Sequence, residues 1–280
     1  MQVDIPVPES AAQKRSASAA LPIHLRWLEW FGRRSEGVAR AAGQMFLLLW
    51  GTITALVSRR TTFRHIAREL EWMGVASMPI ITVTGILAGV VTSQQGGYQF
   101  TGNVPLYIVG SVVASSIILE LGPVLTAVVF IGRVGARITA ELGTMKVSEQ
   151  IDALHSLGRH PIDQLIAPRI IAGLIALPLL TAYANGIGIL AGMLTAEATL
   201  GLGRESFLYG VRIYWHTFDL WYSVGKGAVF GLIVPLIASH MGLLTHGGAE
   251  GVGRSTTTAV VYMIMAVLVL DATFPMIFLR

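Results

Sequence analysis

The chain has 280 residues, of which 53% are hydrophobic and only 13% are Asp, Glu, Lys or Arg. A soluble domain has roughly 25% charged residues. This chain therefore has too few polar side chains to cover the surface of a soluble domain. The composition argues against a soluble enzyme, a coiled coil or a disordered chain. It predicts an all-α integral membrane protein with space for about five or six spanning helices of about 20 residues each.

The basic residues are concentrated near the N-terminus. Ten of the 20 Lys and Arg residues lie between Lys14 and Arg68, where residues 1–68 hold only four acids. Basic residues that precede hydrophobic helices typically hold the cytoplasmic side of a membrane. We favour that interpretation over nucleic-acid binding. The chain contains no cysteine, which excludes disulfides and Cys-ligated zinc.

Two segments precede the main hydrophobic region. Residues 1–20 are small and polar and predict a disordered tail. Residues 21–64 predict an interfacial, membrane-embedded helix region, because Trp27 and Trp30 share one helical face and arginines lie mostly elsewhere. A short soluble helix packed on a partner is the alternative. Within this region, residues 41–58 carry no charge but have arginines at both ends, so we expect a segment that is embedded and returns to the same side.

Residues 65–280 are expected to form a domain of five spanning helices. The chain from Trp72 to Leu119 has no charged residue or histidine, which gives two passes separated by a Gly-rich turn at 95–105. We place the end of the second pass near Ile131. The remaining three passes are expected at about 170–196, 221–243 and 255–278, and the last of these begins on a Ser/Thr run that can cap a helix.

The distribution of charge gives the orientation. The segment 133–169 carries five basic residues and the 95–105 turn carries none, so we expect 133–169 to be cytoplasmic. The N-terminus is then cytoplasmic and the C-terminus periplasmic. The segment 197–219 becomes an external loop with some helix and an aromatic rim. Within 133–169, residues 137–158 predict a cytoplasmic helix that docks on a partner, with Val147, Ile151 and Leu154 on one face. The alternative is an interfacial helix without a partner.

Three ionisable residues fall within expected spanning helices: Glu120, Lys226 and Asp271. Each costs at least about 2.5–3.5 kcal/mol at bilayer depth, so such residues usually face a protein interior or a wet cavity. Two acids and one base can satisfy one another. Two roles remain open. The cluster can lock the helices together, or it can line a substrate path or proton relay.

Small and proline residues add to this picture. Pro123 lacks the N–H that would bond to the carbonyl of Leu119, so we expect a kink beside Glu120. Glycines spaced four apart predict close helix contacts, namely the pairs Gly85/Gly89, Gly188/Gly192 and Gly227/Gly231.

Several catalytic motifs are missing. The chain has no GxxxxGK[ST] phosphate loop, no GxSxG elbow and no HExxH metal motif, and its seven histidines are scattered. We therefore expect neither an enzyme nor a metal site, and no cofactor in this chain.

Three blocks resemble the MlaE/YrbE permease family of lipid-transporting, MCE-associated ABC systems. They are ELGPVLTAVVFIGRVGARITAELGTMKVSEQIDAL at 120–154, PRIIAGLIALPLL at 168–180, and GVGRSTTTAVV with the following LD at 251–271. The resemblance covers about residues 22–279. It implies a homodimeric permease in the bacterial inner membrane, moving phospholipid or a related lipid between that membrane and a periplasmic MCE-domain carrier.

The resemblance also implies partners and residue roles. A separate cytoplasmic ATPase dimer would bind ATP and Mg and contact the 137–158 segment, and a small STAS-type subunit is a further possible partner. The implied lipid path is Leu87, Val91, Gln94, Gln95, Tyr98 and Glu120. The implied intramembrane polar cluster is Glu120, Lys226 and Asp271. The implied ATPase-coupling residues are Arg133, Arg137, Glu141, Lys146, Glu149 and Asp152.

One position departs from the family pattern. Family members often carry Arg before ELGP, whereas this chain has Leu119, so a direct contact from an arginine there is not expected. Two other functions remain as alternatives. One is a proton-coupled secondary transporter that uses Glu120 and Asp271, although no inverted repeat is visible. The other is a membrane-embedded lipid enzyme, for which no convincing acid–base pair is found.

Overall fold

A computed structural model describes residues 23–58, 61–100 and 104–278, and everything described is helix, turn or short connection. The chain divides into two compact units, residues 1–47 and 48–280. The expected disordered tail at 1–20 lies outside the described residues, as do the side chains on which the interfacial face of residues 22–34 was predicted. In the first unit the backbone is helical from Ile23, and Glu36 pairs with Arg40 one turn later at 2.7 Å.

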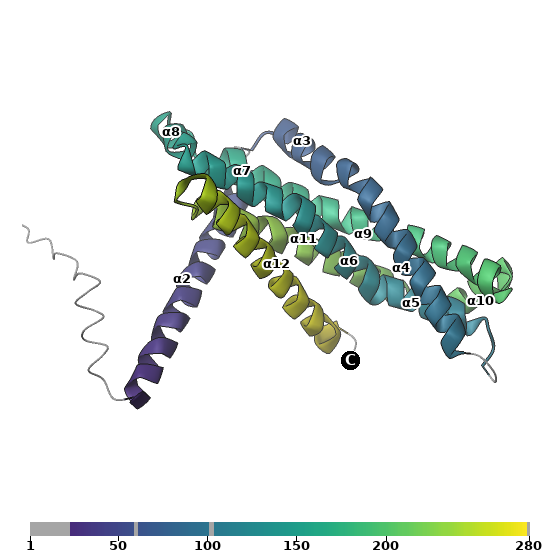
Figure 1. The fold of residues 1–280 in the computed structure, drawn as a ribbon. Coiled ribbons are helices and arrows are strands. Elements are labelled where there is room, and N and C mark those ends of the chain that lie inside the picture. The colour runs from purple at the N-terminus through teal and green to yellow at the C-terminus, as the bar shows by residue number, and fades with distance from the viewer. Residues whose placement is uncertain (1–22, 59–60, 101–103, 279–280) are drawn as a thin grey trace, which may run out of the picture. The chain divides into compact units, whose positions relative to one another are not determined.

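The second unit is a helical bundle (Figure 1). Among the residues that the structure describes in the whole chain, six segments are long and apolar enough to cross a membrane. The bounds of the α-helices are α2 Ile23–Val57, α3 Phe63–Met73, α4 Met78–Gln99, α5 Ile108–Ser116, α6 Gly122–Phe130, α7 Ala136–Val147, α8 Gln150–Ser156, α9 Ala167–Leu200, α10 Arg204–Ile213, α11 Thr217–Leu243 and α12 Gly248–Phe278. Single π-helical turns at Ile117–Leu121, Ile131–Gly135 and Ile162–Ile166 join α5 to α6, join α6 to α7 and begin α9, and a short 3-10 turn, Val75–Ser77, joins α3 to α4.

The all-α membrane architecture predicted from the sequence is confirmed, with one more candidate span than the five expected. The additional segment is Ala39–Val57. It lies within the unbroken helix α2, and the described residues show no reversal inside 41–58. Its embedding without crossing stays a prediction.

Glycine contacts hold the bundle together, as predicted. Any Cβ on Gly89 would overlap the carbonyl oxygen of Gly188, which shows that α4 and α9 touch backbone to backbone. Gly231 of α11 meets Gly173 of α9 in the same way. Close approach of this kind depends on residues without side chains. Helix α11 therefore lies against α9, and it also packs on α7 and α12.

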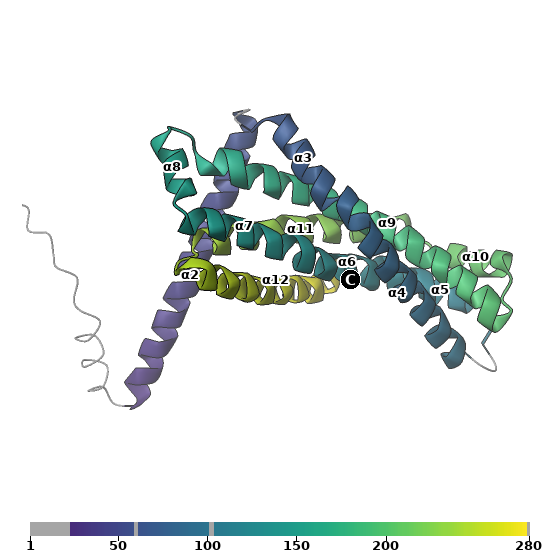
Figure 2. The same ribbon diagram turned by 45° about the horizontal axis from the view of Figure 1, so that its top comes forward.

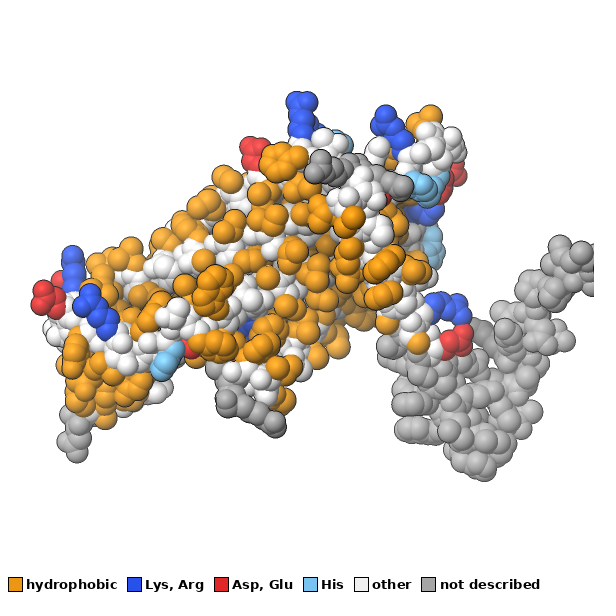
Figure 3. Space-filling view, turned by 180° about the vertical axis from the view of Figure 1, so that it is seen from behind, with side chains coloured by type: hydrophobic (Ala, Val, Ile, Leu, Met, Phe, Trp, Pro, Cys, Tyr) orange, Lys and Arg blue, Asp and Glu red, His pale blue; other side chains and the backbone are white. Residues whose placement is uncertain are grey.

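Charge is segregated to the ends of the bundle. Both ribbon views place α8 at one end and α10 at the other (Figures 1 and 2). In the space-filling view the surface between these ends is mostly hydrophobic, and most Lys, Arg, Asp and Glu side chains lie near the ends (Figure 3). An apolar belt between two charged rims is what a bilayer requires.

The helix that contains the second pass extends beyond the point near Ile131 where that pass is expected to end. The helix does not stop near Ile131 but continues without interruption from Ile108 to Val147. The arginines in this extension have hydrogen-bond or ion-pair partners within the chain. Arg133 donates to the carbonyl of Trp72 at 3.0 Å, and Arg137 pairs with Glu141 at 2.6 Å.

The expected coupling helix at 137–158 is also corrected. It is two helices, α7 and α8, separated at Ser148 and Glu149. Glu149 has a left-handed backbone with φ of 59°, which ends the regular helix there. Val147 therefore belongs to α7, while Ile151 and Leu154 belong to α8.

The start of the last pass differs in a similar way. Helix α12 begins at Gly248, before the expected start at about residue 255, so the Ser/Thr run lies inside the helix. The hydroxyls of Thr256, Thr257 and Thr258 donate to carbonyls four residues earlier. These hydroxyls are hydrogen-bonded within the helix and do not cap its N-terminus.

Candidate functional site

Lys226 of α11 is the centre of a buried ion cluster. Its side chain is fully buried, and its Nζ lies 2.7 Å from Glu120 Oε2 and 2.6 Å from Asp271 Oδ1. Glu120 sits in the π-helical turn Ile117–Leu121 and Asp271 in α12, so one ammonium joins three segments of the bundle. The structure thus brings the three predicted residues together.

A backbone carbonyl completes the coordination of this ammonium. Lys226 Nζ also donates to the carbonyl oxygen of Leu119 at 3.1 Å. Pro123, four residues after Leu119, has no N–H to offer that carbonyl, so the lysine supplies a donor that the helix lacks. Two of the three N–H bonds of the ammonium are thus used on Leu119 and Glu120, while Asp271 Oδ1 lies at ion-pair distance and has no hydrogen-bond partner among the described residues.

The π-helical turn is the local response to Pro123. The N–H of Gly122 bonds to the carbonyl of Ile117, five residues earlier, which widens the helix just before the proline. Gly122 is needed there, because a Cβ would overlap the side-chain oxygen of Asn185. This widened turn carries Glu120 to Lys226. The Glu120 side chain remains 44% exposed on the protomer, while that of Asp271 is 20% exposed.

An apolar groove lies beside this turn, between α4 and α6. It is open on one side and has a volume of about 410 Å³. Leu87, Val91 and Gln95 of the predicted lipid path line it. The other lining residues, which the sequence reasoning did not single out, are Thr84, Ala88, Thr92, Leu121 and Leu125.

The other predicted path residues do not line the groove. Gln94 and Tyr98 are exposed on α4, with Tyr98 at 83% exposure, and Glu120 lies next to the lining residue Leu121. The groove side of α4 follows the helical spacing 84, 88, 91, 95. That spacing is the signal in the sequence that could have separated Gln95 from Gln94.

A second charged network lies toward the α8 end. Arg169, at the start of α9, has a side chain only 8% exposed and contacts Glu141 of α7 at 2.9 Å and Glu69 of α3 at 3.5 Å. Glu69 also accepts a hydrogen bond from the indole of Trp72. The guanidinium of Arg137 stacks over the Trp72 ring at 4.5 Å. This network ties α3, α7 and α9 together.

The predicted ATPase-coupling residues therefore fall into two groups. Arg133, Arg137 and Glu141 make contacts within the chain, to α3, along α7 or to α9. Lys146, Glu149 and Asp152 lie at the turn between α7 and α8, where Glu149 and Asp152 are exposed and Lys146 pairs with Asp152 at 3.0 Å. We call this segment the α7–α8 turn (residues 146–152); it is exposed, as is Arg137 of α7.

Glu69, Trp72 and the bridging contacts of Arg169 were not predicted from the sequence. The partners of Arg169 are 28 and 100 residues away in the chain, and no short-range spacing encodes such contacts. One signal was available: an acid and a tryptophan three residues apart in a short helix just before the first charge-free run. In the described part of the chain, no three His, Cys, Asp or Glu side chains gather to hold a metal.

A mainly hydrophobic surface, charged ends and a lateral apolar groove define a multi-pass membrane protein of the transporter class. Comparison with known proteins specifies that class. The family described as "Permease MlaE" matches residues 66–277. The chain belongs to the MlaE permease family, and it is a membrane permease of the ABC transporter type.

Individual relatives agree with this assignment. A probable ABC transporter permease protein of Synechocystis is 37% identical over 86% of this chain and 88% of its own length. The intermembrane phospholipid transport system permease protein MlaE of Haemophilus influenzae is 31% identical over 88% of this chain and 95% of its own length. The chloroplastic protein TRIGALACTOSYLDIACYLGLYCEROL 1 of Arabidopsis thaliana is 34% identical over 85% of this chain and 66% of its own length.

Proposed function

We propose that this chain is the inner-membrane permease of a lipid ABC transporter, moving phospholipid between that membrane and a periplasmic MCE-domain carrier. The observation that carries the proposal is the apolar groove between α4 and α6, with a volume of about 410 Å³ and a single polar amide, Gln95, on its wall. Acyl chains suit its Leu and Val residues. The Haemophilus influenzae relative is named as a phospholipid transport permease.

A separate ATPase dimer would drive the movement. The chain itself has no GxxxxGK[ST] phosphate loop, and the Synechocystis relative is named as an ABC permease. ATP and Mg would be bound by the partner. We place its contact at the α7–α8 turn, because Glu149 and Asp152 are exposed there. A second copy of the chain would close the open side of the groove, and a small STAS-type subunit would complete the cytoplasmic assembly.

Filling the groove tests its role. Val91→Trp places an indole in the groove, whereas Val83→Trp adds the same bulk to the same helix outside it. The two valines are similarly exposed, at 49% and 56%. In proteoliposomes with the ATPase and the carrier, we expect lipid transfer to fall about tenfold or more in Val91→Trp and to stay near wild type in Val83→Trp, because only the first blocks the apolar site. Equal transfer by both variants would show that lipid does not use the groove.

Charge reversal tests the coupling contact. Glu149→Arg together with Asp152→Arg is expected to weaken ATPase association. The two new positive charges would repel partner groups that complement the native acids. Glu197→Arg, an exposed acid on α9 near the α10 end, is the control. Unchanged association in the double variant would remove the α7–α8 turn from the contact.

A further inference from the structure

The α10 end of the bundle holds a pocket that is separate from the α4–α6 groove. It is open, has a volume of about 800 Å³, and lies between α10 and the residues that lead into α5. Its polar wall consists of Tyr107, Glu205, Ser206, Tyr209 and Arg212, and leucines complete it. The transport mechanism proposed above uses none of these residues.

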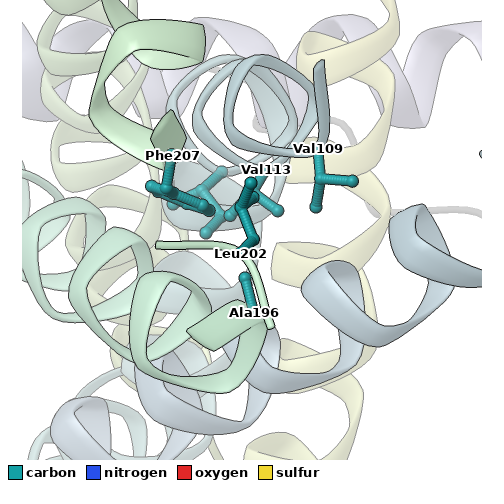
Figure 4. Close-up of a cluster of buried hydrophobic side chains, with 6 residues drawn as sticks. Val109, Val113, Ala196, Leu202 and Phe207 are labelled. Carbon is teal, nitrogen blue, oxygen red and sulfur yellow. The ribbon is translucent and has the colours of Figure 1, made fainter. Parts of the chain in front are cut away.

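The floor of the pocket is rigid. A Cβ on Gly110 would overlap the carbonyl of Phe207, and one on Gly210 would overlap the carbonyl of Tyr107, so α5 and α10 touch backbone to backbone. Ser111 Oγ locks the crossing with a 2.7 Å hydrogen bond to the carbonyl of Gly210. Below it lies a buried apolar cluster, shown in Figure 4, which consists of Val109, Val113, Ile117, Ala196, Leu202 and Phe207. The backbone beneath the pocket is therefore held in place by packing within the chain.

Two opposite charges on one face of α10 line this pocket. Glu205 and Arg212 are seven residues apart, about two turns of helix, and both are exposed. Neither has an ion-pair or hydrogen-bond partner among the residues that the structure describes. Arg204, on the same helix, differs because it is paired with Glu197 at 2.6 Å. The pocket thus offers one free anionic group and one free cationic group.

Two tyrosines accompany the acid. Tyr209 lies one turn after Glu205, and its ring meets that of Tyr107 edge to face, with centroids 5.4 Å apart. Aromatic rings next to a carboxylate favour an ammonium group. At the other end of the face, a guanidinium favours a phosphate, to which it can donate two hydrogen bonds. The hydroxyl of Ser206 adds a further donor to the pocket wall.

The pocket lies where the membrane surface is expected. Helix α10 connects α9 and α11, both of which are long and apolar enough to span a bilayer. Exposed aromatic residues follow α10 closely, namely Tyr214, Trp215 and Trp221. Tryptophan and tyrosine concentrate at the level of lipid headgroups. A ligand in this pocket would therefore be at headgroup depth.

We propose that the pocket binds the headgroup of a zwitterionic phospholipid. Arg212 and Ser206 would hold the phosphate, and Glu205 with the two tyrosines would hold the amine. The inference rests on the proposed function only in taking phospholipid as the ligand. It requires no transport, because the pocket is complete in this chain.

Native mass spectrometry of the purified full chain in detergent tests the site without ATPase or ATP. The probes are phosphatidylethanolamine and phosphatidylglycerol. Arg212→Gln is expected to weaken binding of both lipids about tenfold, because it removes charged hydrogen bonds to phosphate. Glu205→Gln is expected to weaken phosphatidylethanolamine about tenfold and leave phosphatidylglycerol unchanged or tighter. Arg204→Gln and Glu197→Gln are matched controls on the pair outside the pocket, and they should stay within about twofold of wild type.

Each result decides the matter. Equal binding by Arg212→Gln and Arg204→Gln would overturn the site, and so would an equal loss of both lipids in Glu205→Gln. Both pocket residues are exposed, so unfolding midpoints equal to wild type are expected and show that the variants fold. If the wild-type chain binds these lipids but its complex shows no ATP-driven transfer, the proposed function is contradicted and the headgroup site is not.

Discussion

Lys226→Met removes the ammonium at the centre of the ion cluster while keeping a side chain of similar length. It leaves Glu120 and Asp271 without the cation that they share, and the carbonyl of Leu119 without its donor. Breaking a buried ion pair costs about 3–5 kcal/mol, and a buried carbonyl without a partner costs about 1–3 kcal/mol. We therefore expect the free energy of unfolding to fall by about 3–5 kcal/mol.

The assay is titration with SDS in mixed micelles, followed by circular dichroism. A triple variant supplies the control: Lys226→Met with Glu120→Gln and Asp271→Asn removes all three charges. Replacing a whole buried ion set with uncharged groups is often nearly neutral, so this variant should recover to within about 1 kcal/mol of wild type. A loss below about 1 kcal/mol in the single variant, or a triple variant as unstable as the single one, would refute the reasoning.

Two further substitutions test other contacts by the same titration. Gly89→Leu is expected to cost about 2 kcal/mol or more, because its side chain would overlap the carbonyl of Gly188. Gly186→Leu on α9 meets open space and should cost nothing measurable, so equal effects would show that α4 and α9 do not touch there. Arg169→Met is expected to cost about 3 kcal/mol, since it removes a guanidinium that is 8% exposed and leaves Glu69 without an ion pair, while Glu141 keeps Arg137. Arg204→Met, which breaks an exposed pair, should cost less than about 1 kcal/mol, and an Arg169 effect as small as that would contradict the network.

The spanning helices were predictable because the bilayer fixes both their length and their composition. The long charge-free run from Trp72 to Leu119 needs no knowledge of tertiary contacts to be interpreted. The continuation of the second helix to Val147 was not predictable in this way. Its arginines suggested an end to the helix, but the partner of Arg133 is the carbonyl of Trp72, 61 residues earlier in the chain.

The candidate site shows the same division. Three ionisable residues in apolar helices suggested a mutual cluster, since the membrane offers them no water. The contact between Lys226 and the carbonyl of Leu119 could be predicted from the sequence only in part. Pro123 indicates that the carbonyl lacks a donor, but only the fold shows that a lysine 107 residues away supplies it. The groove needed the fold too, because its two walls come from α4 and α6.

The most direct test of the proposed function is phospholipid transfer in proteoliposomes that contain this chain with its ATPase and carrier. We expect transfer that requires ATP and stops when the phosphate-loop lysine of the ATPase is replaced. A pH gradient applied without ATP should move no lipid. Transfer driven by that gradient in the absence of ATPase, and lost in Glu120→Gln, would contradict the ABC mechanism and favour a proton-coupled transporter.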